Sequence, residues 1–249
     1  MIDLGQGDCL EIMPTIPDKS IDMILCDLPY GTTQNKWDII IPFELLWTNY
    51  WRVLKDNGVI VLFGQDKFSA KLMLSSDNHK YNLIWDKQLV SGFLNANKMP
   101  LRSHEDICIF YKKQPTYNPQ KTKGKKSHSK GKMKSDKNNN YNEYGKVDNT
   151  DILGELKHPV SIVSFQKPHP SKAYHPTEKS VELLEYLIKT YTLENETVLD
   201  NCMGSGSTGV ACINTNRNFI GIEKEENYFN IAQKRIQEAI ENKQGELFK

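Results

Sequence analysis

The amino-acid sequence predicts an α/β protein with a mostly parallel sheet of seven strands and helices on both faces. Two observations predict this class. Short strand-like and helix-like segments alternate towards both ends of the chain, and a glycine-rich turn links a strand to a helix near the carboxyl terminus. Strands that alternate with helices pair in parallel, because each helix carries the chain back across a face of the sheet.

The composition is typical of a globular protein that forms one large domain or a core with one insertion. Of the 249 residues, 38% are hydrophobic and 25% are charged. No apolar run approaches the roughly 20 residues of a membrane span and no secretory signal is present, so we expect a cytoplasmic protein. The five cysteines and six histidines lack the spacing of disulfide frameworks and metal sites, and we therefore predict no metal.

The predicted elements follow one another in a regular order. Short apolar runs bounded by turn residues predict strands over 1–5, 21–27, 58–64, 81–86, 105–111, 197–201 and 218–223. Apolar residues three and four positions apart predict helices over 42–56, 66–76, 180–192, 207–216 and 226–243. Pro42 near the start of the first helix and Gly58 after its end are typical boundary residues.

The strand at 21–27 ends in residues that a buried strand does not need. The chain continues there as Asp27, Leu28, Pro29, Tyr30 and Gly31. In open α/β sheets, ligands bind at the carboxyl ends of the strands. The sequence therefore indicates a candidate site here, although an acid after a strand is more often a cap or a turn residue.

A second candidate site lies in the stretch VLDNCMGSGSTGVAC, residues 198–212. A short strand runs into a glycine-rich turn and then a helix, so the backbone can approach a nucleotide-type cofactor and helix amides can receive an anionic group. Glu223 ends the next strand, where a carboxylate can accept hydrogen bonds from a ribose diol. The alternative is a tight turn with a surface glutamate.

The position of this glycine turn argues against a nicotinamide dehydrogenase. A dehydrogenase normally begins with such a turn and continues with further strands and helices. Here only one strand and one helix follow it, so the strand at 1–5 must complete the sheet beside them. The chain is therefore predicted to be circularly permuted.

A lysine-rich segment between the two candidate sites carries most of the positive charge. Eleven lysines and two acids lie between Lys112 and Lys146, although the net charge of the whole chain is only +1. We take residues 114–149 as an insertion, flexible without DNA, in a domain formed by 1–113 and 150–249. The insertion is either a solvated loop or a segment that contacts phosphates and orders on nucleic acid.

Six stretches together resemble the permuted (beta-class) amino-group DNA methyltransferases, which use S-adenosylmethionine. They are GDCLEIM (7–13), DMILCDLPYG (22–31), LLWTNYWRVLKDNGVIVLF (45–63), HPTEKS (175–180), VLDNCMGSGSTG (198–209) and FIGIEKEENYFNIAQKR (219–235). The resemblance covers nearly the whole chain outside the lysine-rich segment. It implies a Rossmann-like methyltransferase fold and site-specific methylation of adenine N6 in double-stranded DNA, in a bacterial or phage-infected cell.

The resemblance assigns roles to residues of both candidate sites. The catalytic residues are Asp27, Leu28, Pro29 and Tyr30. The cofactor contacts are Asp8, Cys9, Asp27, Thr177, Lys179, Asp200, Gly204, Ser205, Gly206 and Glu223. In this assignment Asp8 lies beside the adenine of the cofactor, and Thr177 and Lys179 lie near its methionine end. A helix cap and a surface salt bridge are the alternatives for these three residues.

The chemistry of an exocyclic amine explains the tetrapeptide. The N6 lone pair of adenine is delocalised into the ring, so a catalyst must favour a geometry in which the pair points at the methyl group. The Asp27 carboxylate and the Leu28 carbonyl would each accept one N–H, while Pro29 fixes the turn and Tyr30 stacks on the flipped base. Leu28 replaces a commoner proline of the family, which a main-chain contact tolerates.

The lysine-rich segment corresponds to the target-recognition region of the family. Its candidate DNA contacts are Lys121, Lys123, Lys125, Lys126, Lys130, Lys132 and Lys134. Phe93 is a further candidate, either stacking on the flipped base opposite Tyr30 or filling its own loop as a hydrophobic plug. The partners that the resemblance allows are a homodimer and a cognate restriction endonuclease.

Three alternatives stay open. The acid at Asp27 favours adenine over cytosine N4 by resemblance, and it does not exclude cytosine. The substrate amine could also lie in RNA. A catalytically silent nucleic-acid-binding module on the same fold is the alternative from a different class, although the intact tetrapeptide and glycine turn argue against it.

Overall fold

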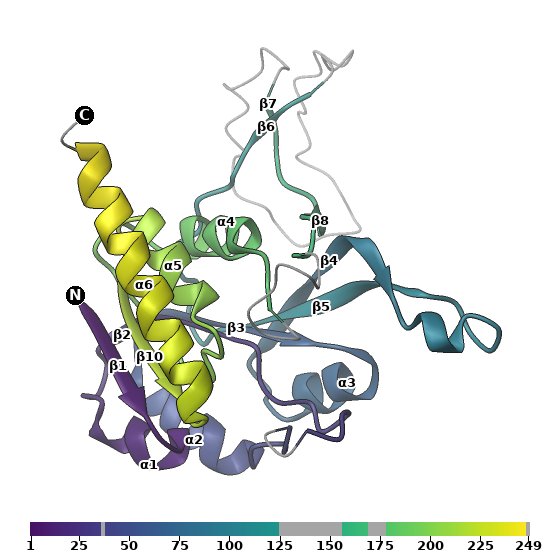
Figure 1. The fold of residues 1–249 in the computed structure, drawn as a ribbon, viewed down its shortest axis with the longest axis horizontal. Helices are drawn as coiled ribbons and strands as arrows, with labels where there is room; N and C mark the ends of the chain where they lie inside the picture. Colours follow the sequence, from purple (N-terminus) through teal and green to yellow (C-terminus); the bar gives the residue numbers. More distant parts are fainter. Residues whose placement is uncertain (36–37, 125–155, 169–177, 248–249) are drawn as a thin grey trace, which may run out of the picture. The chain divides into compact units, whose positions relative to one another are not determined.

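The computed structural model describes residues 1–35, 38–124, 156–168 and 178–247 (Figure 1). The chain forms two compact units, one of Met1–Asn118 with Ser161–Lys249 and one of Pro119–Val160. In the second unit, the described residues form a short antiparallel pair of strands, β6 (Thr122–Lys123) and β7 (Leu156–Lys157). The insertion expected at 114–149 stays a prediction, because most of it lies outside the described residues.

An eight-stranded sheet is the centre of the first unit. Its strands are β1 (Ile2–Gln6), β2 (Ile21–Cys26), β3 (Leu54–Gly64), β4 (His79–Ser91), β5 (Arg102–Phe110), β8 (Ile162–Ser164), β9 (Thr197–Asp200) and β10 (Asn218–Glu223). They lie in the order β1-β10-β9-β2-β3-β5-β4-β8. Strand β5 is antiparallel to its neighbours β3 and β4, and the other pairs are parallel. The predicted mostly parallel α/β sheet is thus confirmed.

The predicted number of seven strands is one too few. All seven predicted segments form strands, and the eighth, β8, pairs in parallel with β4 from Ile84–Ile162 to Asp86–Ser164. Strand β8 has only three residues, which is too short for an alternating pattern to be recognised. Strand β4 continues to Ser91, five residues beyond the predicted end, because Ser91 still pairs with Arg102 of β5 after an irregularity in the register that follows Asp86.

Five helices of the first unit agree with the prediction and one was missed. The helices are α1 (Cys9–Ile12), α2 (Phe43–Val53), α3 (Asp66–Leu74), α4 (Val181–Tyr191), α5 (Ser207–Asn214) and α6 (Glu226–Leu247). Helix α1 is a single turn of four residues, capped by Asp8 and followed by a 3₁₀ turn. Helix α2 ends earlier than predicted, because Leu54 already pairs with Ile21 in the sheet.

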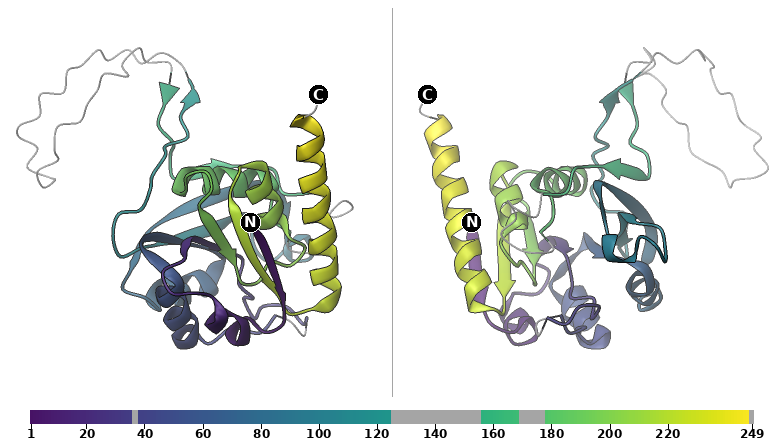
Figure 2. Two further views of the ribbon diagram at one scale, coloured as in Figure 1. Left: turned by 90° about the vertical axis from the view of Figure 1, so that its left-hand side faces the viewer. Right: turned by 45° about the vertical axis from the view of Figure 1, so that its right-hand side comes forward.

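Helices cover both faces of the sheet and form two separate cores (Figure 2). Helices α4, α5 and α6 pack on one face, and α1, α2 and α3 on the other. Strand β2 contributes to both, because alternate side chains point to opposite faces. Met23 and Leu25 lie in the α4–α6 core, whereas Ile24 and Cys26 lie in the α1–α3 core, all at most 1% exposed.

The two ends of the chain meet in the sheet. Strand β1 pairs in parallel with β10, in register from Ile2–Phe219 to Gln6–Glu223. This pairing confirms the expectation that the amino-terminal strand completes the sheet beside the glycine turn. It also brings the carboxyl ends of β1, β10, β9 and β2 to one edge. Among the described residues, no helix is long and apolar enough to cross a membrane.

Candidate active site

A cavity of about 1070 Å³ opens at this edge of the sheet. Its lining includes Asp27, which follows β2, and also Asp200 and Glu223, the last residues of β9 and β10. These acids are far apart in the sequence and meet because parallel strands end on the same side. The volume slightly exceeds the roughly 300–1,000 Å³ of a pocket for one small ligand. The cavity therefore has room for two ring systems.

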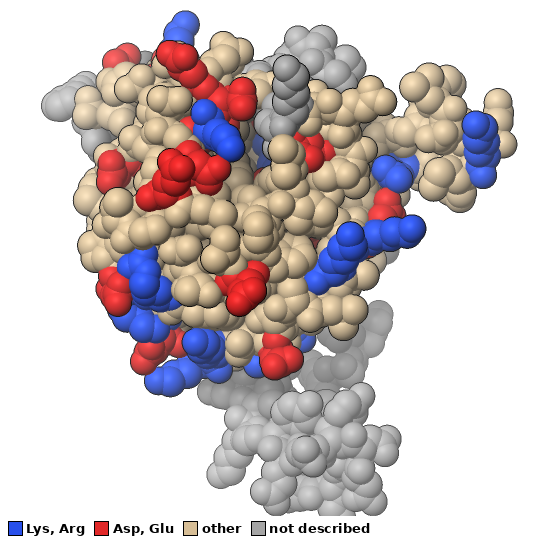
Figure 3. Space-filling view, turned by 90° about the horizontal axis from the view of Figure 1, so that it is seen from below, with Lys and Arg blue, Asp and Glu red and all other residues tan. Residues whose placement is uncertain are grey.

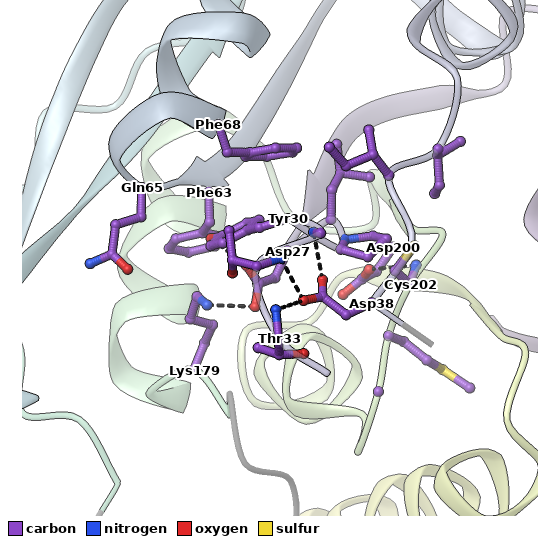
Figure 4. Close-up of a pocket in the computed structure, with 18 of the residues that line it drawn as sticks. Asp27, Tyr30, Thr33, Asp38, Phe63, Gln65, Phe68, Lys179, Asp200 and Cys202 are labelled. Atoms are coloured by element: carbon purple, nitrogen blue, oxygen red, sulfur yellow. Dashed lines mark hydrogen bonds and ion pairs between the residues drawn. The ribbon is translucent and has the colours of Figure 1, made fainter. Parts of the chain in front are cut away.

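The Asp-Leu-Pro-Tyr stretch brings its acid and its tyrosine together at the cavity wall. The Tyr30 hydroxyl donates a hydrogen bond of 2.7 Å to Asp27 Oδ1. The Tyr30 ring stacks on Phe68 of α3, with 4.6 Å between ring centroids and 27° between ring planes (Figure 4). Leu28 is buried in the α1–α3 core and Pro29 lines the cavity. The Leu28 side chain thus anchors the turn, while Asp27 and Tyr30 face the cavity.

Asp27, which is partly buried, begins a row of four charges that alternate in sign, and the other three are buried. Lys179 Nζ lies 2.5 Å from Asp27 Oδ2 and 3.2 Å from Glu105 Oε2, and Lys87 Nζ donates to Glu105 Oε1 at 3.2 Å. Burial raises the pKa of Asp27, and the Lys179 ammonium opposes that rise. Burial alone would lower the pKa of Lys179, but the two carboxylates outweigh it and raise the pKa. Lys179 is therefore a cation at neutral pH.

Asp38 holds the loop that follows the tetrapeptide. Its carboxylate accepts three backbone N–H bonds, from Gly31 at 2.8 Å, Thr32 at 2.9 Å and Thr33 at 2.6 Å. Burial raises the pKa of Asp38, but hydrogen bonds from the Thr33 side chain and from these N–H groups outweigh burial and bring the pKa below its ordinary value. An ionised Asp38 therefore fixes the path of the chain directly after Tyr30.

The glycine turn approaches Glu223 through its backbone. Gly204 and Gly206 have φ values of +52° and +82°, which favour glycine. The Gly204 N–H donates to Glu223 Oε2 at 2.8 Å, and the Glu225 N–H donates to Glu223 Oε1 at 2.8 Å. Burial raises the pKa of Glu223 above its ordinary value. Ser205, between the two glycines, is buried and lines the cavity.

Asp200 stabilises the glycine turn through hydrogen bonds to residues on either side of it. It is 4% exposed, and its two oxygens accept bonds from the Cys202 N–H at 3.1 Å and from the Thr208 hydroxyl at 2.7 Å. Burial raises the pKa of Asp200 to about 6. Asp200 thus ties the end of β9 to the first turn of α5, on either side of the glycine residues.

Asp8 and Cys9 form the side of the cavity next to β1. Asp8 caps α1 by accepting the Leu10 N–H at 2.9 Å, and it pairs with Lys224 at 3.0 Å. The Leu10 hydrogen bond and Lys224 lower the pKa of Asp8. Both Asp8 and Cys9 line the cavity, and Cys9 is buried. The helix cap and the salt bridge considered as alternatives for Asp8 are therefore present, and they leave it at the cavity wall.

An ion pair absent from the sequence analysis connects the HPTEKS stretch to the glycine turn. Arg235 of α6 contacts Glu178 at 2.8 Å. The same guanidinium donates to the Ser205 carbonyl at 2.7 Å and to the Ser205 hydroxyl at 2.8 Å. Glu178 and Ser205 are both buried. Arg235 lies in α6, whose many charged residues are typical of a helix exposed to solvent. The sequence therefore gives no signal for this contact, which only the tertiary structure shows.

Some predicted site residues lie away from the cavity or outside the described residues. Phe93 is 81% exposed and does not line the cavity, and the described ring that stacks on Tyr30 is Phe68. Lys121 and Lys123 belong to the second unit. The residues outside the described part of the chain are Thr177, Lys125, Lys126, Lys130, Lys132 and Lys134. The role of Phe93 and of these lysines in DNA binding stays a prediction.

Charge on one face of the molecule is mixed. Figure 3 shows one face of the molecule, on which Lys and Arg side chains lie among Asp and Glu side chains and many uncharged ones. This face has no broad field of one sign to attract a polyanion. In the part of the chain that the structure describes, no group of three His, Cys, Asp or Glu residues is arranged to hold a metal ion.

Comparisons with known proteins identify the family. A family profile described as DNA methylase, for N6 and N4 methyltransferases, matches residues 21–234. This match covers most of the chain, and the chain therefore belongs to the N6/N4 DNA methylase family, as the resemblance implied.

Curated relatives extend over almost the whole chain. Type II methyltransferase M2.MboI of Moraxella bovis is 28% identical over 262 residues, which cover 95% of this chain and 88% of that protein. Type II methyltransferase M.HindIII of Haemophilus influenzae is 24% identical over 306 residues, covering 95% and 96%.

Solved structures share the fold. The M1.HpyAVI–SAM complex has a TM-score of 0.66 at 26% identity and covers 95% of this chain and 99% of that chain. The cytosine-N4-specific PvuII DNA methyltransferase has a TM-score of 0.65 at 14% identity, with coverage of 96% and 91%. The second likeness shows a common fold alone.

Proposed function

We propose that this chain transfers a methyl group from S-adenosylmethionine to the exocyclic N6 of adenine in a flipped-out base of double-stranded DNA. The observation that carries the proposal is the place of Asp27. Its carboxylate lies beside Tyr30 at the wall of a cavity with room for a cofactor and a base. When bound, S-adenosylmethionine supplies a methyl group on a positively charged sulfur.

The cavity lining fits this cofactor. Gly204 offers backbone without a side chain at the cavity wall, and Glu223 offers a carboxylate at a strand end, where a ribose diol can donate to it. Gly206, also predicted as a cofactor contact, does not line the cavity and instead packs against Ala232 of α6. We assign Ser205 and Cys9 to contacts along the same wall, and Asp8 to the adenine of the cofactor. Asp200 acts through the turn, because backbone and hydroxyl groups of the turn already occupy its oxygens.

The residues at the other end of the cavity orient the target amine. The Asp27 carboxylate accepts one N–H of the amine and the Leu28 carbonyl accepts the other, which directs the nitrogen lone pair out of the base plane. Pro29 fixes the turn between them. Tyr30, supported from behind by Phe68, stacks on the base. After transfer, the methylated nitrogen releases a proton to Asp27 or to water.

Adenine is proposed over cytosine because an aspartate in this tetrapeptide is typical of the adenine enzymes of the family. The fold does not decide between the two bases, since the PvuII enzyme with the same fold is specific for cytosine N4. Both bases present an exocyclic amine with two N–H groups, which Asp27 and Leu28 could hold alike.

The decisive experiment measures the product. The purified protein is incubated with unmethylated genomic DNA and methyl-deuterated S-adenosylmethionine, and the nucleosides are analysed by mass spectrometry. Labelled N6-methyldeoxyadenosine is the expected product. Labelled N4-methyldeoxycytidine would overturn the choice of adenine, label in RNA alone would overturn the choice of DNA, and no label with either would favour a silent nucleic-acid-binding module.

The variant Asp27→Ala separates catalysis from cofactor binding. We expect at least a hundredfold loss of kcat, because the amine loses an oriented acceptor. Thermal stabilisation by S-adenosylmethionine, which follows RT ln(1 + [L]/Kd), should stay close to that of the wild type. NAD serves as the control ligand and should give no stabilisation. Unchanged turnover by this variant would refute the role of Asp27.

DNA contact by the lysine-rich segment is tested by removing residues 121–137. Each phosphate neutralised contributes a slope of about −0.9 to the dependence of log K on log salt. The deletion should weaken DNA binding and flatten this dependence, and an unchanged slope would make the segment a solvated loop.

A homodimer and a cognate restriction endonuclease remain predictions, for which sedimentation and co-purification are the tests.

A further inference from the structure

The row of charges behind the tetrapeptide is more buried than a surface ion pair. Lys87 is 2% exposed, Lys179 7% and Glu105 8%, and the Asp27 side chain is 21% exposed. Lys87 lies in β4 and Glu105 in β5. Lys179 lies two residues before α4, and Asp27 lies in the turn after β2. Charges at such depth are costly unless they are paired, and here every charge has a partner of opposite sign. The two carboxylates and the two ammonium groups of the row therefore balance to a net charge of zero.

Asp27 is a strong acceptor for an amine in its ionised form, because protonation turns one carboxyl oxygen into a donor and removes the negative charge from the other. Burial works against ionisation at this position. The charged or titratable groups that interact with Asp27 from the surrounding elements are Lys179, Glu105, Tyr30, Lys167, Cys26 and Asp200. Among the described residues, Lys179 is the cation within hydrogen-bond distance of the Asp27 carboxylate.

Resting on the function proposed above, we propose that Lys179 is a positioning residue that keeps Asp27 ionised and directs its carboxylate towards the target amine, and that Glu105 and Lys87 hold Lys179 in place. Lys179 binds Oδ2. The other oxygen, Oδ1, has the Tyr30 hydroxyl as its partner, which an arriving amine can replace. The ammonium group thus leaves one defined oxygen for the substrate.

Glu105 has a second effect in this arrangement. During transfer the amine nitrogen would form a bond to the methyl carbon as the bond between that carbon and the sulfonium sulfur breaks. The nitrogen gains a positive charge, which is lost when it releases a proton to Asp27 or to water. An isolated ammonium beside Asp27 would oppose that charge. Glu105 Oε2, 3.2 Å from Lys179 Nζ, offsets the field of the ammonium, although the contact lacks hydrogen-bond geometry. Lys87 secures Glu105 from the far side through Oε1.

The test compares two substitutions whose effects on Asp27 have opposite signs. Lys179→Gln removes the cation, so Asp27 ionises at higher pH, and the acid limb of the kcat/KM profile should move up by about 1 to 3 pH units. Glu105→Gln removes an anion near Asp27, so the acid limb should move down, while kcat on the plateau falls. A residue that only supported the fold would lower activity without moving the limb.

A second readout does not depend on the reaction. Asp27 is titrated in the cofactor-free protein by ¹³C NMR of labelled aspartate, with Asp27→Asn to assign the signal. Its midpoint should rise in Lys179→Gln and fall in Glu105→Gln. If the wild type methylates no nucleic acid, the proposed function fails, whereas this titration still decides whether Lys179 holds Asp27 ionised.

Three further variants make the result interpretable. Lys179→Arg keeps the cation and should retain the wild-type limb. Lys55→Gln removes a lysine that pairs with Asp22 at 2.7 Å outside the cavity, and should leave both readouts unchanged. If Glu105→Gln does not fold because Lys87 loses its partner, the double variant Lys87→Met/Glu105→Gln replaces it. Unchanged midpoints of Asp27 in Lys179→Gln would overturn the proposal.

Discussion

Gly206 tests the packing of the glycine turn against helix α6. It precedes α5 with a φ of +82°, and a Cβ at this position would lie 2.9 Å from Ala232 Cβ and 3.0 Å from Ala232 Cα in α6. The left-handed conformation costs alanine about 1–2 kcal/mol, and overpacking against a backbone costs roughly 1–3 kcal/mol. We therefore expect Gly206→Ala to lower the free energy of unfolding by about 2–5 kcal/mol.

Two other glycines separate these contributions. Gly92 has a φ of +86°, and no atom lies within 4 Å of the position that a Cβ would take there, so Gly92→Ala should cost only the conformational part. Gly245, inside α6, also has nothing within 4 Å, and Gly245→Ala should stabilise the protein by up to about 1 kcal/mol. Urea unfolding with unchanged m-values gives the three free energies.

The packing predicts the order of the three unfolding free energies: Gly206→Ala is the least stable variant, Gly92→Ala is intermediate and Gly245→Ala is the most stable. Gly206→Ala should also weaken S-adenosylmethionine binding, because relief of the clash moves the turn away from α6, whereas Gly92→Ala should not. If Gly206→Ala were as stable as Gly92→Ala, the close approach of α6 to the turn would be refuted.

Further predictions concern the acids and their partners. Asp38→Ala should lower kcat by about 10- to 100-fold with S-adenosylmethionine affinity unchanged, since the loop after Tyr30 loses its anchor; single-turnover rates and calorimetry check this. With its pKa raised to about 6, Asp200 stabilises the fold most below about pH 4 and loses roughly 3 kcal/mol as the pH rises to 6; Asp200→Asn should remove this slope from unfolding curves. Tyr30→Phe keeps the ring on Phe68 and should retain base stacking, whereas the pKa of Asp27 should rise because the hydrogen bond from the Tyr30 hydroxyl is lost. A loss of stacking, measured by the fluorescence of DNA that contains 2-aminopurine, would contradict the prediction.

Much of the fold could be predicted from local patterns. The seven predicted strands and five predicted helices have clear apolar patterns, and their order specifies which ends meet. The α-helix and the sheet strand of the first unit that were missed, α1 and β8, have four and three residues. Such segments have no period of their own, and their structure depends on tertiary partners, namely the Asp8 cap and the pairing with β4.

The site was predictable where it follows from topology and not where it depends on side-chain contacts. Asp27, Asp200 and Glu223 end parallel strands, so the sheet brings them together by construction. Glu105 stands at the start of a predicted strand, where an acid is typical of an exposed edge. Its burial follows from two lysines that approach it from other elements, Lys87 and Lys179. Sequence spacing contains no signal for such a meeting.

The partners of each acid explain which carboxylate at the cavity is able to bind a ligand. Asp38 is held by three backbone N–H groups of the loop after Tyr30, and Asp200 by a backbone N–H and a buried hydroxyl. Releasing either would disturb the path of the main chain. Asp27 differs, because both of its partners, Tyr30 and Lys179, are ends of side chains. A side chain can give up one hydrogen bond at the cost of a rotamer change, so among these carboxylates Asp27 is the one that can exchange a partner for a ligand.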